Sequence, residues 1–339
     1  MASGGGNIFA QGGARCIFTQ NCPLVRDPSF HYTNMRFVFP IFKPNSFHAI
    51  LAVTDKGEVI RDSNSYLDDP IRGLAHYEAE HTIYERINRA YDMLANGSPC
   101  KTIDQEVCYA MSPFESVNFG HSVSNLFNIL HEYRSRGLTC PIVLSEESKR
   151  FPNLLTLAQL LFPGIVFIEN NTILTFRSVH IFEPLILDIL RHPHIIEECR
   201  TRALATLGDL ERFKNKKIFM PKLITTNANI VKRSTAFRAK VWLDILAEIP
   251  DWVYINPEQM DICEIIAYLT FAKTIVTSTG SIFYGHGVFY SPDAHWMFLY
   301  KIGSLDNYHV EYYWDRFHYL NCDEDLDASI DTLRSGLDM

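Results

Sequence analysis

Short apolar runs alternate with amphipathic segments through most of the chain, and this alternation predicts an α/β fold. Nearly continuous apolar runs with the length of buried strands occupy residues 141–144, 165–168, 217–220 and 252–255. Between such runs lie segments with apolar residues at helical spacing, for example residues 122–136. Because strands covered on both faces are apolar at every position, the pattern favours parallel sheets packed between helices.

The same reasoning places the other elements. Residues 48–60 have the pattern of a β-hairpin with a turn at Gly57, and Gly137 is a stop signal for the helix at residues 122–136. Asp261 and Glu264 have the spacing of an N-cap and its third helical residue. Further strands are expected at residues 172–182, 274–278 and 296–302, and further helices at residues 75–95, 154–161, 235–249, 261–272 and 308–320.

The alternation stops and restarts, which predicts two lobes. A chain of 339 residues exceeds one typical hydrophobic core, and a second series of strands begins at Lys217. We therefore expect two Rossmann-like lobes with a cleft between them, because ligands of such sheets lie beyond the carboxyl ends of the strands. The expected parts are an N-terminal leader at 1–45, a first lobe at 46–212, a second lobe at 213–305, and a closing helix with an acidic tail at 306–339.

Composition narrows the class of protein. The formal net charge of -8 argues against a protein that binds the nucleic-acid backbone. The eight cysteines are scattered without a Cys-x-x-Cys pair, so we expect reduced thiols and a cytoplasmic location. The first residues lack the pattern of a signal peptide, and no apolar stretch reaches the roughly 18 residues that a membrane span requires.

One segment places an imidazole where a helix begins. Asn118-Phe-Gly120-His121 precedes the amphipathic helix expected at residues 122–136, and Asn125 lies in its first turn. A histidine here can cap its own loop, which is a structural role. It can also act as a general base, because imidazole titrates near neutral pH and accepts a proton from a hydroxyl. We take His121 as the candidate base, with Asn118, Gly120 and Asn125 beside it.

A second segment has the features of an anion site. Thr277-Ser278-Thr279-Gly280-Ser281 follows a buried strand, and small residues there let backbone N–H groups approach a phosphate. The alternative is a simple turn between a strand and a helix. The spacing of Gly280 and Gly285 is similar to that of a Walker loop, but His286-Gly287 occupies the position of its Lys-Ser/Thr pair, and no Gly-x-Gly-x-x-Gly segment is present. Kinase-like and dehydrogenase interpretations are therefore weak.

Cations follow the first strand of the second lobe. Lys222, Arg233 and Arg238 are suited to a diphosphate, although basic loop residues are more often only solvated. The acidic segment at residues 323–327 lies in the tail, and His192-Pro-His194 has the composition of a loop. We therefore predict no metal site.

These segments resemble glycosyltransferase family 61, whose domain is shared by plant xylosyltransferases and animal O-linked N-acetylglucosaminyltransferases. The family has an Asn-x-Gly-His segment that opens a helix, here Asn118-Phe-Gly-His121. It then has a strand ending in a basic residue and a loop arginine, here Lys222 and Arg233. A Pro-Glu segment and an Ala-x-x-Ile-Val segment with a glycine turn come next, here Pro257-Glu258 and residues 272–281. The likeness runs in family order from about residue 50 to 305.

The resemblance implies a GT-B-type fold and an inverting, metal-independent transfer of a sugar to a hydroxyl of a glycan or glycoprotein. The co-substrate is a nucleotide sugar, expected to be UDP-linked, and no further cofactor is needed. His121 is then the base on the acceptor side, and Glu258 contacts the ribose or the nucleobase. The donor-binding residues are Lys222, Arg233, Arg238, Thr277, Ser278, Thr279, Gly280 and Ser281.

Two departures from the family pattern leave alternatives open. Family members usually carry Arg where this chain has Lys222, and His where it has Thr279. Lysine loses the planar two-bond grip of a guanidinium on phosphate. A catalytically silent nucleotide- or carbohydrate-binding protein is therefore the second hypothesis. Another two-lobed nucleotide-sugar enzyme, such as an epimerase, is the third.

Overall fold

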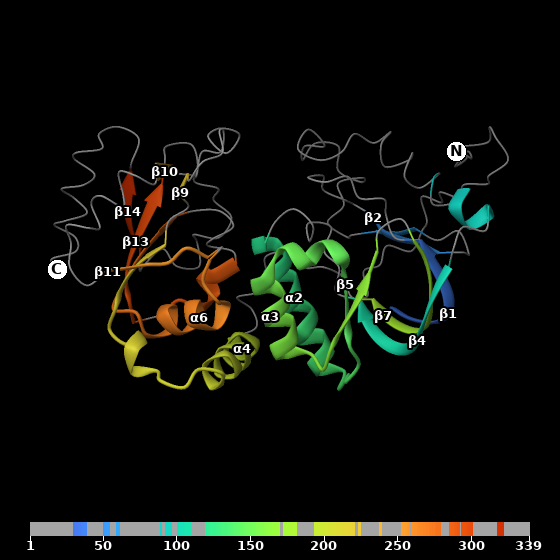
Figure 1. The fold of residues 1–339 in the computed structure, drawn as a ribbon, viewed down its shortest axis with the longest axis horizontal. Helices are drawn as coiled ribbons and strands as arrows, with labels where there is room; N and C mark the ends of the chain where they lie inside the picture. Colours follow the sequence, from blue (N-terminus) through green and yellow to red (C-terminus); the bar gives the residue numbers. More distant parts are fainter. Residues whose placement is uncertain are drawn as a thin grey trace, which may run out of the picture. The chain divides into compact units, whose positions relative to one another are not determined.

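The structure, a computed structural model, divides the chain into two compact units, Met1–His192 and Pro193–Met339 (Figure 1). Both units have α/β character, with parallel strands and helices. The structure describes residues 30–38, 50–54, 59–61, 89, 92–96, 100–109, 119–169, 172–181, 193–220, 223–224, 237–238, 252–257, 259–278, 285–291, 293–300 and 317–321.

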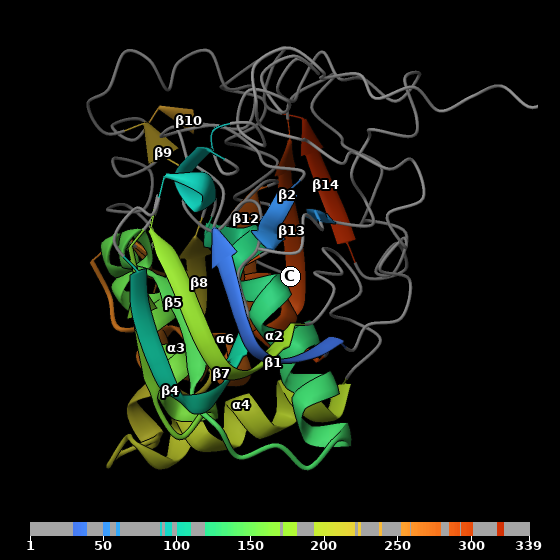
Figure 2. The ribbon, with the colours of Figure 1, turned by 90° about the vertical axis from the view of Figure 1, so that its right-hand side faces the viewer.

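The first unit is built on a mixed sheet. Among the described residues its strand order is β3-β2-β1-β7-β4-β5-β6, and Figure 2 shows β1, β7 and β4 side by side. The four strands from β7 to β6 are parallel, whereas β1, β2 and β3 are antiparallel to their neighbours. The strands are β1 (Phe30–Val38), β2 (Ile50–Thr54), β3 (Val59–Arg61), β4 (Cys100–Tyr109), β5 (Ile142–Ser145), β6 (Ile165–Ile168) and β7 (Ile173–Ile181).

Part of this sheet corrects the sequence-based expectation. The hairpin formed by β2 and β3, and the strands β5, β6 and β7, were predicted and are confirmed. In contrast, β1 lies within the leader expected at 1–45, where it pairs with both β2 and β7. Its aromatic and β-branched residues favour a strand, and this local preference outweighs the Gly- and Pro-rich composition of the surrounding leader. The sheet is therefore mixed, although a parallel sheet was expected.

Two helices accompany β5. The predicted apolar stripe of α2 (Phe119–Ser135) is confirmed, because Val123, Leu126, Phe127 and Leu130 are all buried. The helix ends in a Schellman motif, in which Gly137 has φ +63° and the Leu138 N–H donates to the Tyr133 carbonyl (3.1 Å). The second helix is α3 (Pro152–Leu161), preceded by η3 (Glu146–Arg150).

The second unit contains a fully parallel sheet. Among the described residues its order is β11-β8-β12-β13-β14. The helices α4 (Pro193–Ala205) and α6 (Ile262–Phe271) pack on each other, so residues 193–205 belong with this unit rather than with the lobe expected at 46–212. The strands are β8 (Lys217–Met220), β11 (Trp252–Tyr254), β12 (Thr274–Ser278), β13 (His295–Tyr300) and β14 (Phe317–Asn321).

The expected start of α6 is confirmed with one difference. The Asp261 carboxylate accepts a hydrogen bond from the Cys263 N–H (2.8 Å), as an N-cap does. Glu264 forms an ion pair with Arg212 (2.6 Å), which comes from η5 (Glu211–Phe213). The cap is therefore the aspartate, and the glutamate ties the helix to the preceding segment.

Two predicted helices are wrong where the structure describes them. Phe317–Asn321 forms β14, beside β13, although a closing helix was expected at 308–320. Phe237–Arg238 forms β10, which pairs with β9 (Leu223–Ile224), although a helix was expected at 235–249. Aromatic and branched residues fit a pleated, partly covered surface as well as a helix, so short segments of this composition are decided by their neighbours. The rest of both predicted helices lies outside the described residues.

Candidate functional site

The strand order of the second unit brings the ends of β8 and β12 together. Among the strands of this sheet, β8 is followed along the chain by β11 and then by β12, and these two strands lie on opposite sides of β8. Such a reversal of strand order in an open parallel sheet opens a crevice at the carboxyl ends of the two strands, where ligands bind. Here the last paired residues of the two strands are Met220 and Thr277.

Several donor-binding residues predicted from the sequence lie at these two strand ends or follow them in the chain. Ser278 is the last residue of β12, and Arg238 is the last residue of β10. Lys222, Arg233, Thr279, Gly280 and Ser281 lie outside the described residues, as does Glu258, and nothing is described of the Ser278 and Arg238 side chains. The structure thus fixes the strand ends from which Lys222 and residues 279–281 continue.

Thr277 holds the two strand ends to each other. Its side chain is buried, and its hydroxyl donates to the Met220 carbonyl on β8 (3.1 Å). The same oxygen accepts a hydrogen bond from the Tyr290 hydroxyl (2.9 Å). Tyr290 in turn packs edge-on against Trp296, with ring centroids 5.0 Å apart. The only hydroxyl proton of Thr277 is therefore used within the protein, and the residue ties the end of β12 to the end of β8.

The acceptor-side residues belong to the first unit. Gly120, His121 and Asn125 lie in the first two turns of α2, whose first residue, Phe119, has its ring 6.0 Å from that of Phe151. Asn118 lies outside the described residues, and so do the side chains of His121 and Asn125. The cleft predicted between the lobes would combine residues of both units, and it stays a prediction.

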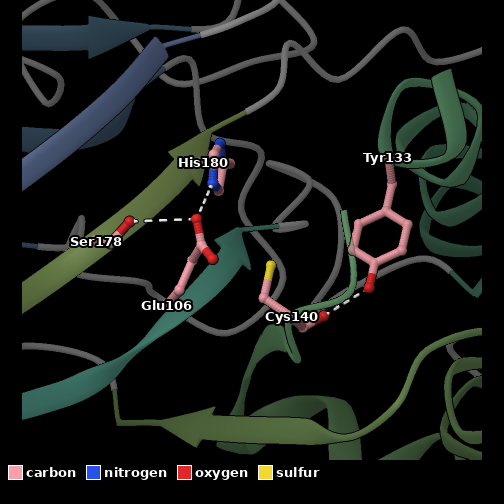
Figure 3. A network of polar contacts seen from close by, with 5 residues as sticks. All are labelled: Glu106, Tyr133, Cys140, Ser178 and His180. Atoms are coloured by element: carbon pink, nitrogen blue, oxygen red, sulfur yellow. Dashed lines mark hydrogen bonds and ion pairs between the residues drawn. The ribbon is translucent and has the colours of Figure 1, made fainter. Parts of the chain in front are cut away.

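The structure adds a polar cluster that the sequence reasoning missed. The Glu106 carboxylate on β4 lies between the Ser178 hydroxyl and the His180 ring on β7 (Figure 3). Its Oε1 atom is 2.7 Å from His180 Nε2 and 3.5 Å from Ser178 Oγ. A strand had been expected at residues 172–182, which contains both Ser178 and His180, but none at residues 100–109. Without β4 the sequence offers no partner for this histidine.

The buried thiols near this cluster are poor nucleophiles. Burial raises the pKa of Cys140 to about 11, and the Glu106 carboxylate adds to that rise. Burial likewise raises the pKa of Cys108 well above its ordinary value. The Tyr133 hydroxyl donates to the Cys140 carbonyl (2.8 Å), and burial raises the pKa of that phenol to about 12. Because the thiolate is the reactive form, we assign no catalytic role to these cysteines.

Among the residues that the structure describes, no group of three or more His, Cys, Asp or Glu side chains could hold a metal ion. Within the same ranges, none of the helices is both long and apolar enough to cross a membrane. Comparisons of the sequence with protein families and with curated proteins give no match.

Proposed function

We propose that the protein is a glycosyltransferase with a GT-B-type arrangement of two Rossmann-like lobes. The observation that carries the proposal is the reversal of strand order at β8 in the second unit. That reversal makes the ends of β8 and β12 neighbours, and Lys222 and the segment Thr279-Gly280-Ser281 follow these two ends. A cation and a small-residue turn beside one crevice suit the diphosphate of a nucleotide sugar.

The proposed reaction is a single displacement. A hydroxyl of a glycan or glycoprotein acceptor attacks the anomeric carbon, and the bond from that carbon to the diphosphate oxygen breaks on the opposite side. His121 accepts the hydroxyl proton, and the electron pair of the broken bond leaves with the nucleoside diphosphate. Lys222, Arg233 and the N–H groups of the Gly280 turn stabilise the growing charge, a task that fixed positive groups perform without a metal.

The remaining predicted residues have supporting roles in this proposal. Arg238, Ser278, Thr279 and Ser281 contact the donor, and Glu258 contacts its ribose or base. Thr277 acts indirectly, because its hydroxyl fixes the separation of the two strand ends. Asn118, Gly120 and Asn125 line the acceptor side near His121.

The test is a screen for nucleotide release with UDP-, GDP- and dTDP-sugars, run with and without a chelator. We expect release of one nucleoside diphosphate, unchanged by the chelator, and a weaker affinity for the donor in Lys222→Gln. The matched control is Lys214→Gln, since Lys214 lies in the segment before the opposite end of β8 and pairs with Glu211. Equal donor affinity in wild type and Lys222→Gln would show that Lys222 does not bind the donor.

The second candidate is a catalytically silent nucleotide- or carbohydrate-binding protein. The substitutions Lys222 and Thr279, relative to the resembled family, favour it. This candidate gives a thermal shift with a nucleotide but no released diphosphate and no sugar transferred. An epimerase would instead convert the donor to an isomer without releasing the nucleotide.

A further inference from the structure

Two aromatic rings meet where helix α2 begins. Phe119 is the first residue of α2, and Phe151 directly precedes α3. Their ring centroids are 6.0 Å apart, with an angle of 58° between the ring planes, and both side chains are only partly buried. His121, the candidate base, comes two residues after Phe119 on the same helix, so about 3 Å of helix axis separates the two positions. The aromatic pair therefore belongs to the acceptor side of the first unit.

The two rings lie at an edge of the sheet where ligands bind. Strands β4 and β5 are parallel neighbours, and η3 begins directly after the last residue of β5. Phe151 follows η3, and its contact with Phe119 brings the start of α2, the helix that follows β4 in the chain, to the same place. Ligands of open α/β sheets bind beyond the carboxyl ends of the strands, so the aromatic pair is within reach of a ligand.

A guanidinium lies on one of the two rings. The Cζ atom of Arg150 is 4.7 Å from the centroid of the Phe151 ring, and the Arg150 side chain is exposed. Within the part of the chain that the structure describes, this guanidinium forms no ion pair and no hydrogen bond. Stacking on the ring orients the guanidinium plane, and the N–H groups along its edge can hold a carboxylate with two parallel bonds.

The second unit contains the same Arg-Phe step in a structural role. The Cζ atom of Arg212 lies 4.6 Å from the centroid of the Phe213 ring, so the two stacks have nearly the same geometry. There the ring is fully buried, and the guanidinium donates to the Glu264 carboxylate (2.6 Å). The ring of Phe151 is partly exposed instead. Neither a buried ring nor an ion pair among the described residues therefore explains the stack of Arg150 on Phe151.

The chemistry of this surface fits a sugar that carries a carboxylate. A pyranose ring has a face of C–H groups, and this face leaves water when it lies on an aromatic ring. Binding sites for small molecules combine such apolar surface with a few polar groups that fix the orientation of the ligand. The two phenylalanine rings supply the apolar surface, and the guanidinium supplies charge-assisted bonds that only an acidic sugar can use fully.

We propose that Phe119, Phe151 and Arg150 form a binding subsite for an acidic saccharide, of the class that contains a uronic acid. The C–H face of the sugar lies on the rings, and its carboxylate binds the Arg150 guanidinium. As an acceptor subsite the inference rests on the proposed transferase function, whereas binding of the saccharide needs neither the donor nor the second unit. A sugar held here lies near the start of α2, the helix that carries His121.

The experiment measures the binding of matched disaccharides to the full-length protein by NMR titration, without a nucleotide sugar. The panel pairs a disaccharide ending in glucose with one ending in glucuronic acid, and galactose with galacturonic acid. We expect at least one acidic member to bind about tenfold more tightly than its neutral counterpart. Arg150→Gln should reduce the affinity for that member to the neutral level, and Arg150→Lys should retain part of the preference. Phe151→Leu should weaken both members of the pair by about three- to tenfold.

The matched control is Arg212→Gln, which removes the guanidinium of the corresponding stack in the second unit and should leave every affinity unchanged. Thermal unfolding of each variant detects misfolding. If Phe151→Leu does not fold, Arg150→Gln decides, because the Arg150 side chain is exposed. Equal binding of acidic and neutral members, no binding of any member, or an unchanged affinity for the acidic member in Arg150→Gln would overturn the subsite.

The outcomes separate the subsite from the transferase. Binding that depends on Arg150, in a protein that releases no nucleotide from any donor, supports the subsite and overturns the transferase in favour of a carbohydrate-binding protein. Transfer of a sugar to a neutral acceptor, with the same acceptor KM in wild type and Arg150→Gln, overturns the subsite and leaves the transferase intact.

Discussion

Replacing Tyr290 with phenylalanine tests whether the hydroxyl chain at the ends of β8 and β12 holds the crevice together. The change removes the donor to Thr277 Oγ1 and leaves the ring against Trp296. A buried hydrogen bond of neutral groups contributes about 1 kcal/mol, and the acceptor that loses its partner raises the cost to about 1–2 kcal/mol. Thr277→Val removes both bonds of the hydroxyl, including the one to Met220, and should cost about 2–3 kcal/mol.

Tryptophan fluorescence reports this unit alone. All four tryptophans, at positions 242, 252, 296 and 314, lie in the second unit. Urea unfolding followed by fluorescence should therefore give the free-energy changes directly. The corresponding fall in Tm is about 2–4 °C per kcal/mol for a unit of this size. Because the two changes affect one chain of bonds, the Tyr290→Phe/Thr277→Val double variant should cost less than the sum of the single changes. Strict additivity, or no loss in either single variant, would refute the hydroxyl chain.

Three further predictions concern stability. Gly137→Ala should lower the free energy of unfolding by about 1 kcal/mol, because Gly137 has φ +63°. Gly208→Ala is the control and should be tolerated, since an added Cβ at either glycine meets no atom within 4 Å. Equal losses in the two variants would contradict a cost that arises from backbone conformation. Asp261→Ala should lower the free energy of unfolding in urea by about 1 kcal/mol, because α6 loses its N-cap. An unchanged urea midpoint would show that the cap does not stabilise the helix. Folding raises the pKa of Cys140 from 9.0 to about 11. The protonated thiol therefore contributes fully to the stability of the folded state below pH 9, and this contribution is lost as the pH rises toward 11. Tm should therefore fall less steeply with pH in that range in Cys140→Ala than in wild type. An equally steep fall would show that the Cys140 thiol is not its cause.

Continuous apolar runs allowed several elements to be predicted from the sequence. Strands β6, β8 and β12 have the bounds expected from the sequence, and the stripe of α2 is buried as its spacing indicates. Strand β4 has no such pattern, because a bulge interrupts its alternation and most of its first seven side chains are exposed. Strand β14 has helix-compatible spacing and becomes a strand because β13 offers it a free edge. Pairing partners of this kind are set by tertiary structure.

The residues of the candidate site could likewise be predicted only in part from the sequence. The small residues after β12 were recognisable from composition, since a buried strand that ends in hydroxyl and glycine residues is a local signal. The role of Thr277 was not, because its hydrogen-bond partners, Met220 and Tyr290, are distant in sequence or follow an irregular segment. Glu106 and His180 meet only because β7 pairs with β4 in a register that contains a bulge. No spacing rule in the sequence encodes that register.

The most direct test of the central claim is transfer itself. The protein is incubated with each UDP-, GDP- and dTDP-sugar in the presence of a chelator and a panel of glycan acceptors, and released nucleotide and product mass are measured together. We predict that one donor gives nucleoside diphosphate and an acceptor heavier by one sugar, and that Lys222→Gln weakens the binding of that donor. Nucleotide binding without either product, or activity that disappears with the chelator, would contradict it.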